Sequence, residues 1–140
     1  DAKELAAFVE EALRIYGAIH FRVRIALEDS EVAGVRIRKG QTVLIVLSAA
    51  NRDPGSFACP MAIDTARANR GHHMTFHFGP RACVGASLAR ANIQEALHAV
   101  LTRCAGLRLD PQAPAPQFLG FGVRCWRPLR VLFTPEAGMR

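Results

Sequence analysis

Apolar residues near the start of the chain recur at helical spacing. The positions that form this face are Leu5, Phe8, Val9, Ala12, Leu13 and Tyr16. Intervals of three and four residues place side chains on one side of a helix. Gly17 follows directly, and glycine is a common stop signal for a helix. The pattern therefore predicts a helix that ends at Tyr16.

The segments after this helix have the patterns of strands. Residues 19–27 read as extended, residues 35–38 alternate between apolar and basic, and residues 42–47 form the apolar, β-branched run typical of a buried strand. Lys39 and Gly40 supply a turn between the last two. Together these segments predict one small sheet.

Helical spacing returns in the second half of the chain. Residues 49–54 predict a helical turn ended by Pro54, and residues 55–75 are irregular and polar, which predicts an extended loop. One long helix is then predicted from residue 86 to about residue 104, with a cap near Gly106. Its apolar positions are Leu88, Ala89, Ile93, Ala96, Leu97, Val100 and Leu101.

The end of the chain returns to strand patterns. Prolines at positions 111, 114 and 116 mark a loop, and residues 123–126 and 129–133 predict two short strands that form a terminal β-hairpin. No internal repeat is present. The whole pattern predicts an α+β fold, mainly α with small β-sheets, in one domain over residues 1–140.

Composition and charge narrow the class of protein. Half of the 140 residues are hydrophobic, which suffices for one core. Eighteen basic residues, sixteen of them arginine, outnumber twelve acidic ones and give a formal charge of +6. Such a surface suits an acidic protein or an ordinary solvated face. Aromatic residues are not interleaved with the arginines as single-strand binding requires, so we expect no nucleic acid.

The sequence gives two indications of its compartment. No stretch approaches the roughly 20 apolar residues that cross a membrane, and the first residues do not resemble a signal peptide. The four cysteines lie more than twenty residues apart without a C-x-x-C pair, which argues against a zinc site and a disulfide framework. We therefore expect a cytoplasmic protein with no membrane partner.

Cys83 stands out among these cysteines. It lies in a glycine-punctuated loop just before the long predicted helix, where unpaired amides and the helix dipole stabilise a thiolate. Arg81 adds a nearby cation, and Gly79 and Gly85 permit a close approach to the backbone. These features predict a metal ligand or a nucleophile beside a large, flat ligand. The alternative is a free thiol that acts as a small core hydrophobe.

Two other groups of polar residues are candidates for chemistry. Glu11 and Arg14 lie three residues apart on the first helix, which predicts an ion pair. His72, His73 and His77 precede the cysteine but fit no clean zinc pattern. We expect these histidines to face solvent or to make local hydrogen bonds.

The cysteine loop resembles the haem-binding signature of the cytochrome P450 monooxygenases, F-x-x-G-x-R/H-x-C-x-G. The matching residues are Phe76, Gly79, Arg81, Cys83 and Gly85. The upstream segment Glu11-Ala12-Leu13-Arg14 resembles the E-x-x-R pair of the family's K-helix. The resemblance covers nearly all of the chain and implies the C-terminal third of that fold. It would consist of a K-like helix, a small sheet, the cysteine loop, a long L-like helix and the terminal hairpin.

The resemblance also implies roles for single residues. Cys83 would be the proximal ligand of the iron in haem b. Arg24 and Arg81 match positions at which the family binds the haem propionates, and a guanidinium suits a carboxylate. The chain departs from the family at Ala62 and Ile63, where an arginine and a phenylalanine usually complete a network with the E-x-x-R pair. Arg67 or Arg70 is the candidate substitute, without which the loop behind the haem would be held less firmly.

The implied activity is that of a haem-thiolate monooxygenase. The complete protein would insert one oxygen atom from O2 into a small organic substrate, with electrons from a ferredoxin or a flavoprotein. We expect the N-terminal portion, which includes the distal oxygen-activating helix, to be absent from this chain. Two alternatives stay open: a non-catalytic module that binds haem or completes a partner, and a thiol-nucleophile enzyme in which a histidine activates Cys83.

Overall fold

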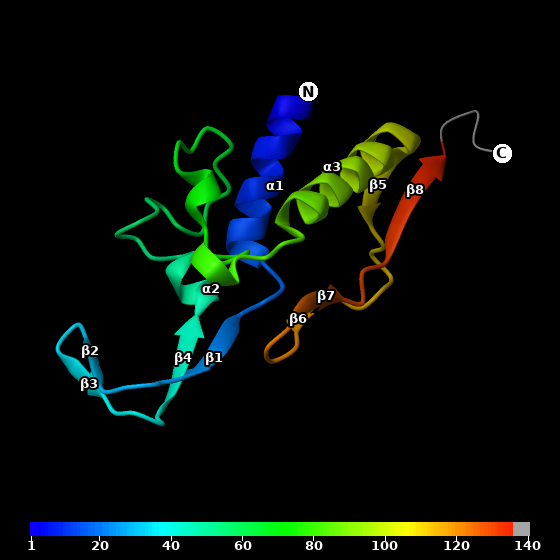
Figure 1. The fold of residues 1–140 in the computed structure, drawn as a ribbon. Coiled ribbons are helices and arrows are strands. Elements are labelled where there is room, and N and C mark those ends of the chain that lie inside the picture. Colours follow the sequence, from blue (N-terminus) through cyan, green and yellow to red (C-terminus); the bar gives the residue numbers. More distant parts are fainter. Residues whose placement is uncertain (136–140) are drawn as a thin grey trace.

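The computed structural model describes residues 1–135 of the chain (Figure 1). In chain order the elements are α1 (Ala2–Tyr16), β1 (Phe21–Ile25), β2 (Ser30–Val32), β3 (Val35–Ile37), β4 (Thr42–Val46), α2 (Leu47–Ala50), η1 (Arg70–His72), η2 (Gly79–Arg81), α3 (Ala86–Arg103), β5 (Cys104–Leu109), β6 (Gln117–Leu119), β7 (Cys125–Arg127) and β8 (Val131–Pro135). None of the helices in this part of the chain has the length and apolar character needed to span a membrane.

Helix α1 follows the prediction closely. The carboxylate of Asp1 accepts a hydrogen bond of 2.9 Å from the amide of Lys3 and caps the first turn. At the other end, a Cβ on Gly17 would lie 2.8 Å from both the Leu13 carbonyl and the Thr75 side chain. Glycine is therefore required here by the close approach of the loop that precedes the cysteine.

The predicted small sheet forms as two separate ribbons. Strand β1 pairs antiparallel with β4, with Phe21 opposite Val46. Strand β3 pairs instead with β2, which the sequence pattern did not indicate. The turn between β2 and β3 places Ala33 and Gly34 at positive φ, the geometry of a tight hairpin turn. The tight turn closes β2 on β3, so β3 does not reach β1 or β4.

The prediction that residues 42–47 form a buried strand is wrong for most of the segment. Leu44, Ile45 and Val46 are 52%, 38% and 41% exposed, and only Leu47, at the start of α2, is buried. An apolar run marks a surface suited to packing, but β1 and β4 form a sheet of only two strands in the described part of the chain, and most of β4 stays uncovered. Helix α2 also begins two residues earlier than the predicted turn at residue 49.

The C-terminal strands pair differently from the prediction. Strand β8 pairs with β5, which continues directly from α3, and β7 pairs with β6. The predicted hairpin between residues 123–126 and 129–133 is therefore wrong, because each segment has an earlier strand as its partner. The predicted helix cap at Gly106 is also wrong. Gly106 has a φ of 62° and lies where the β5–β8 register shifts, so it serves a bulge.

An aromatic cluster attaches the β6–β7 hairpin to the end of α1. The ring of Tyr16 lies 6.3 Å from that of Phe118 and 6.0 Å from that of Trp126, both in edge-to-face arrangements. An isolated antiparallel bridge between Ile19 and Val123 lies beside them. These contacts place the β6–β7 hairpin beside the segment that joins α1 to β1 (Figure 1).

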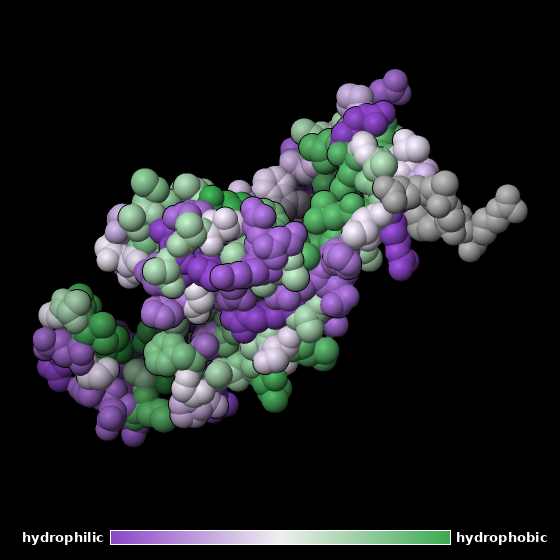
Figure 2. All heavy atoms as spheres, turned by 90° about the horizontal axis from the view of Figure 1, so that it is seen from above, coloured by the Kyte–Doolittle hydropathy of each residue, from purple (hydrophilic) through white to green (hydrophobic). Residues whose placement is uncertain are grey.

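The core is small and largely polar. Its buried hydrophobic members are Ala7, Val9, Ile15, Leu47 and Phe57, and its buried polar members are Glu11, Arg14, Asn51, Arg67, His73 and Thr75. The solvent-accessible surface is 10141 Å², whereas a compact monomer of this mass exposes roughly 7,000 Å². Figure 2 accordingly shows hydrophobic residues at the surface, including the end of the molecule where α3, β5 and β8 lie.

Candidate functional site

Cys83 lies in a closed loop immediately before α3. Its amide donates a 2.8 Å hydrogen bond to the carbonyl of Phe76, which closes the loop. Its own carbonyl accepts a 3.2 Å bond from the amide of Ala86, the first residue of the helix. The thiol is free and the residue is exposed. The sulfur is thus presented at the N-terminal end of an eighteen-residue helix.

The two glycines of this loop, Gly79 and Gly85, are suited to their positions for different structural reasons. Gly79 has a φ of 65°, a conformation that favours glycine, and nothing lies within 4 Å of a Cβ built there. Gly85 has ordinary backbone angles, and a Cβ there would lie 3.9 Å from the sulfur of Cys83. Gly79 is needed for the turn, whereas Gly85 keeps the surface beside the sulfur bare.

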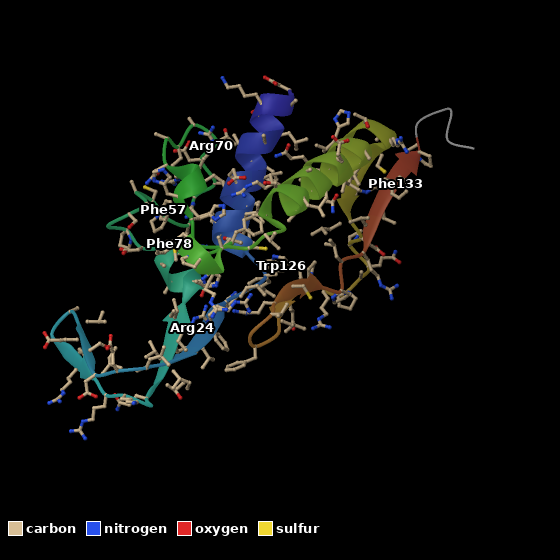
Figure 3. The ribbon with its side chains drawn as sticks, in the orientation of Figure 1. Arg24, Phe57, Arg70, Phe78, Trp126 and Phe133 are labelled. Atoms are coloured by element: carbon tan, nitrogen blue, oxygen red, sulfur yellow. The ribbon has the colours of Figure 1, made fainter. Side chains whose placement is uncertain are left out.

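Basic groups lie near the loop. Arg81 is exposed, and the guanidinium of Arg24 on β1 donates a 2.9 Å hydrogen bond to the carbonyl of the adjacent Val23. Nε2 of His77 is buried and has no hydrogen-bond partner within residues 1–135. Burial lowers the pKa of His77, and the charges of Arg22 and Arg24 lower it further. Figure 3 shows Arg24 on β1 and Phe78 on the loop.

The pair Glu11 and Arg14 is a buried ion pair rather than a surface one. Nε and Nη2 of Arg14 donate to the two carboxylate oxygens of Glu11 at 2.7 and 2.9 Å. The remaining donors of Arg14 reach three backbone carbonyls, of Asn51, Pro60 and Ala62, at 2.7–3.1 Å. All five guanidinium N–H groups are therefore satisfied.

Arg67 is the third member of this network. Its Nε donates to Oε2 of Glu11 at 3.1 Å, and its Nη1 donates to the carbonyl of Ala58 at 2.8 Å. Arg70 does not reach Glu11 and donates to the backbone of Arg67 instead. Of the two candidate substitutes, the structure thus places Arg67 in the network. Ala62 still takes part, because its carbonyl accepts from Arg14.

Glu11 is held strongly in its ionised form. Burial would raise the pKa of Glu11, but hydrogen bonds from Arg14, the amide of Asp64 and Arg67 lower it to about 2. The ring of Phe57 lies under the guanidinium of Arg14, whose Cζ is 4.9 Å from the ring centroid. The network ties the long loop after α2 to the middle of α1.

The three histidines have different surroundings. Nε2 of His73 lies 3.2 Å from Glu10, and Nδ1 accepts a 3.3 Å bond from the amide of Thr75, so the predicted local hydrogen bonding is confirmed for this residue. His72 is exposed. Within residues 1–135, no three histidine, cysteine or acidic side chains gather in a way that could hold a metal ion.

Sequence reasoning missed several polar residues that fix the loop before Cys83. The side chain of Asn51 donates to Thr75 Oγ1 at 2.9 Å and accepts from the amide of Met74 at 2.6 Å. Thr75 in turn donates to the carbonyl of Leu13 at 2.8 Å. A polar residue just after an apolar run was the available signal for Asn51, but its partner lies 24 residues away.

Comparison with known proteins places the chain in a family. The sequence model described as Cytochrome P450 matches residues 3–124. Cytochrome P450 140 of Mycobacterium tuberculosis is 44% identical over 138 residues, which cover 94% of this chain and 30% of that protein. Pentalenic acid synthase of Streptomyces avermitilis is 43% identical over 113 residues, which cover 81% of this chain and 27% of that protein.

Solved structures agree with these sequence matches. P450BioI, in complex with an acyl carrier protein ligated to hexadec-9Z-enoic acid, has a TM-score of 0.87 and 36% identity over 96% of this chain and 34% of its own. A substrate-free cytochrome P450 of Mycobacterium marinum has a TM-score of 0.90 and 28% identity over 96% of this chain and 35% of its own. This agreement confirms the predicted α+β fold class. The chain spans about a third of the length of these relatives, and it belongs to the cytochrome P450 family.

Proposed function

We propose that this chain forms the proximal, haem-binding portion of a cytochrome P450 monooxygenase, with the thiolate of Cys83 as the ligand of the iron in haem b. The observation that carries the proposal is the exposed, unpaired thiol at the start of α3, in a loop closed by the hydrogen bond from the Cys83 amide to Phe76. When bound, the haem supplies dioxygen activation, which an axial thiolate favours.

The residues around Cys83 are chemically suited to this cofactor. An accessible sulfur is the required iron ligand, and the exposed Arg24 and Arg81 offer guanidinium groups for the two propionates. The orphaned Nε2 of His77 is a further polar atom in need of a partner. Phe78 is 74% exposed and provides apolar surface for a flat ring system.

Each part of the chain has a separate task in this proposal. Cys83 lies three residues before the first residue of α3, and its exposed sulfur would be the group that binds the iron. The positive φ of Gly79 allows the turn of the loop, and Gly85 keeps a side chain away from the sulfur. The buried network of Glu11, Arg14 and Arg67 holds the preceding loop on α1.

The substrate and the electron donor are proposed at the level of chemical class. We propose a small organic substrate, O2, and electrons from a ferredoxin or a flavoprotein, for which the excess of arginine offers charge complementarity. The named relatives include pentalenic acid synthase and a P450 that binds an acyl carrier protein. These names describe different partners, so they do not select one for this chain. The oxygen-activating and substrate-contacting parts belong to the length of the relatives that this chain does not span.

The absorption spectrum of the reduced, haem-reconstituted chain under carbon monoxide tests the proposal. We expect the strongly red-shifted Soret band of a thiolate-ligated ferrous complex. Cys83→Ala should abolish this band, whereas the control Cys59→Ala, at another exposed cysteine, should retain it. An ordinary Soret position, or a band that survives in Cys83→Ala, would overturn the assignment of Cys83 as the ligand.

One observation favours a second candidate, the partner-completing module. Helix α3 buries none of its residues in this chain, and Leu88 and Leu101 are each 65% exposed. A module of this kind would take up haem with the same red-shifted band but would turn over only after a second polypeptide covers these surfaces. The thiol-nucleophile alternative has less support, because no histidine within residues 1–135 makes a hydrogen bond to the Cys83 thiol.

A further inference from the structure

A second polar cluster joins α1, α3 and the cysteine loop. Nε and Nη2 of Arg90 on α3 donate to the two carboxylate oxygens of Glu10 on α1, at 2.6 and 3.0 Å. Nε2 of His73 lies 3.2 Å from Oε2 of the same carboxylate. Paired, charge-assisted hydrogen bonds fix the orientation of a guanidinium as well as its position. Glu10 therefore holds Arg90 and His73 in a defined arrangement.

Two side chains of this cluster lie against Phe76, the first residue of the cysteine loop. Cζ of Arg90 lies 4.7 Å from the centroid of the Phe76 ring, within the range of a cation–π contact. The ring of His73 lies 6.1 Å from the same centroid. Phe76 is thus bordered by two side chains that share one carboxylate.

Phe76 is connected in turn to Cys83. Its carbonyl accepts the 2.8 Å hydrogen bond from the Cys83 amide, the bond that closes the loop. The ring and this carbonyl share one Cα, so contacts that hold the ring in place restrict the backbone of Phe76 on which the hydrogen bond depends. The chain of contacts runs from Glu10 through Arg90 and Phe76 to the backbone of Cys83.

The charge state of the cluster supports this arrangement. Burial would raise the pKa of Glu10, but hydrogen bonding and charge from Arg90 and His73 lower it, so the carboxylate is ionised at neutral pH. Hydrogen bonding to Glu10 raises the pKa of Arg90 in return. The side chains of Arg90 and Glu10 are 31% and 17% exposed, which limits screening by solvent.

We propose that Arg90 is a positioning residue for Cys83, which acts through the ring of Phe76 while Glu10 and His73 orient its guanidinium. The consequence for haem ligation rests on the proposed function above. The effect on the loop itself does not, because every contact in the chain of contacts joins residues of this chain. The inference can therefore be tested in haem-free protein.

Hydrogen exchange at the Cys83 amide measures the loop directly. Arg90→Met removes the charge, and we expect it to lower the protection of this amide roughly 5- to 30-fold, as the loss of one or two such contacts implies. Arg90→Lys keeps the charge without the paired donors and should fall between Arg90→Met and the unmodified chain. Arg103→Met is the matched control, since Arg103 is an exposed residue of the same helix with no side-chain hydrogen bond or ion pair among the described residues.

A double-mutant cycle separates positioning from general stabilisation. Phe76→Leu removes the ring, and the double variant with Arg90→Met should lose little more protection than the larger single loss. Additive losses would overturn the inference, because Arg90 would then act independently of Phe76. Equal losses at the Cys83 amide and at buried amides of α1, such as that of Ile15, would also overturn it, because the effect would be global.

Haem ligation provides the second readout. In haem-loaded protein, Arg90→Met should reduce the fraction of the reduced carbon monoxide complex that shows the red-shifted band, whereas Arg103→Met should leave it unchanged. An unaltered fraction, despite lost protection of the loop, would overturn the assignment of Arg90 to the position of the sulfur. If the unmodified chain takes up no haem, the proposed function fails, while hydrogen exchange still decides the role of Arg90 in the loop.

Discussion

Helices α1 and α3 have similar lengths but opposite surroundings. Five of the fifteen residues of α1 are buried, among them Glu11 and Arg14, whereas none of the eighteen residues of α3 is buried. The long loop between α2 and η2 covers α1 on one side, as Figure 1 shows. This chain is therefore organised around a polar network on α1. The apolar residues of α3 form contact surface rather than core.

Exposed apolar residues of α1 and α3 meet in one groove. Leu5 and Phe8 of α1, together with Leu97 and Leu101 of α3, line an open groove between the two helices, and Asp1, Glu4 and Thr65 complete its lining. Within residues 1–135, the side-chain hydrogen bonds between the two helices are those of Arg90 to Glu10. The two helices are therefore joined through charge at one level and separated by exposed apolar surface at another.

Removal of Arg14 should lower the stability of this chain more than any other change considered for α1 or α3. Arg14→Ala leaves the carboxylate of Glu11 buried with one cation fewer and leaves three backbone carbonyls without a donor. Loss of one partner of a buried pair costs about 3–5 kcal/mol. We expect the free energy of unfolding, measured by chemical denaturation, to fall by this amount.

The matched control for this prediction is Arg70→Ala. Arg70 is only half-buried and makes one side-chain hydrogen bond, to the carbonyl of Arg67. Its loss should cost about 1 kcal/mol or less. Similar losses for the two variants would contradict the view that the buried network of Glu11, Arg14 and Arg67 organises the fold.

The sequence predicted the parts of this fold that depend on local patterns. Helical spacing located α1 and α3. The residues around Cys83 match a haem-binding signature because its spacing is local and specific, and their role as a site stays a prediction. Strand partners were not predictable in the same way. Strand β8 could pair with β7 or with β5, and that choice depends on contacts between residues about 30 positions apart, such as Cys104 and Pro135.

It was harder to predict which residues are buried, and which arginine joins the network of Glu11, than to predict secondary structure. The apolar run at residues 42–47 indicates a segment that could be buried. Whether it is buried depends on where the other elements lie. In the same way, Arg67 and Arg70 are equivalent in the sequence. The path of the loop around α1 brings Arg67 within 3.1 Å of Glu11 and leaves Arg70 outside. Glu10 and Arg90 gave no signal because 80 residues separate them.

Acid should lower the stability that the network on α1 provides, by less than the removal of Arg14 does. Glu11 has a folded-state pKa of about 2 and an ordinary value of 4.5, so the unfolded chain binds the proton first as the pH falls. The stability from this group is complete above pH 4.5 and is lost progressively toward pH 2, by at most about 1.4 kcal/mol per pH unit. Denaturation curves across this range should show the decline.

Glu11→Gln provides the control for the acid prediction. This variant lacks the titrating group, so its stability should be lower at neutral pH and should depend less on pH between 4.5 and 2. Glu10, whose pKa is also lowered, will contribute a remaining slope in both proteins. An identical pH dependence in the two proteins would show that Glu11 is not the group responsible.

The smallest effect on stability is expected on α3. Leu88 is 65% exposed, so Leu88→Gln removes little buried apolar area and should change the free energy of unfolding by less than about 0.5 kcal/mol. Val9 on α1 is fully buried, so Val9→Gln leaves an unpartnered amide in the core. It should lower the free energy of unfolding by about 2 kcal/mol or more. Leu88→Gln should also reduce self-association in sedimentation measurements, because exposed apolar patches promote contact between molecules. A large loss of stability at Leu88 would instead mean that α3 packs within this chain, and the contrast between the two helices would disappear.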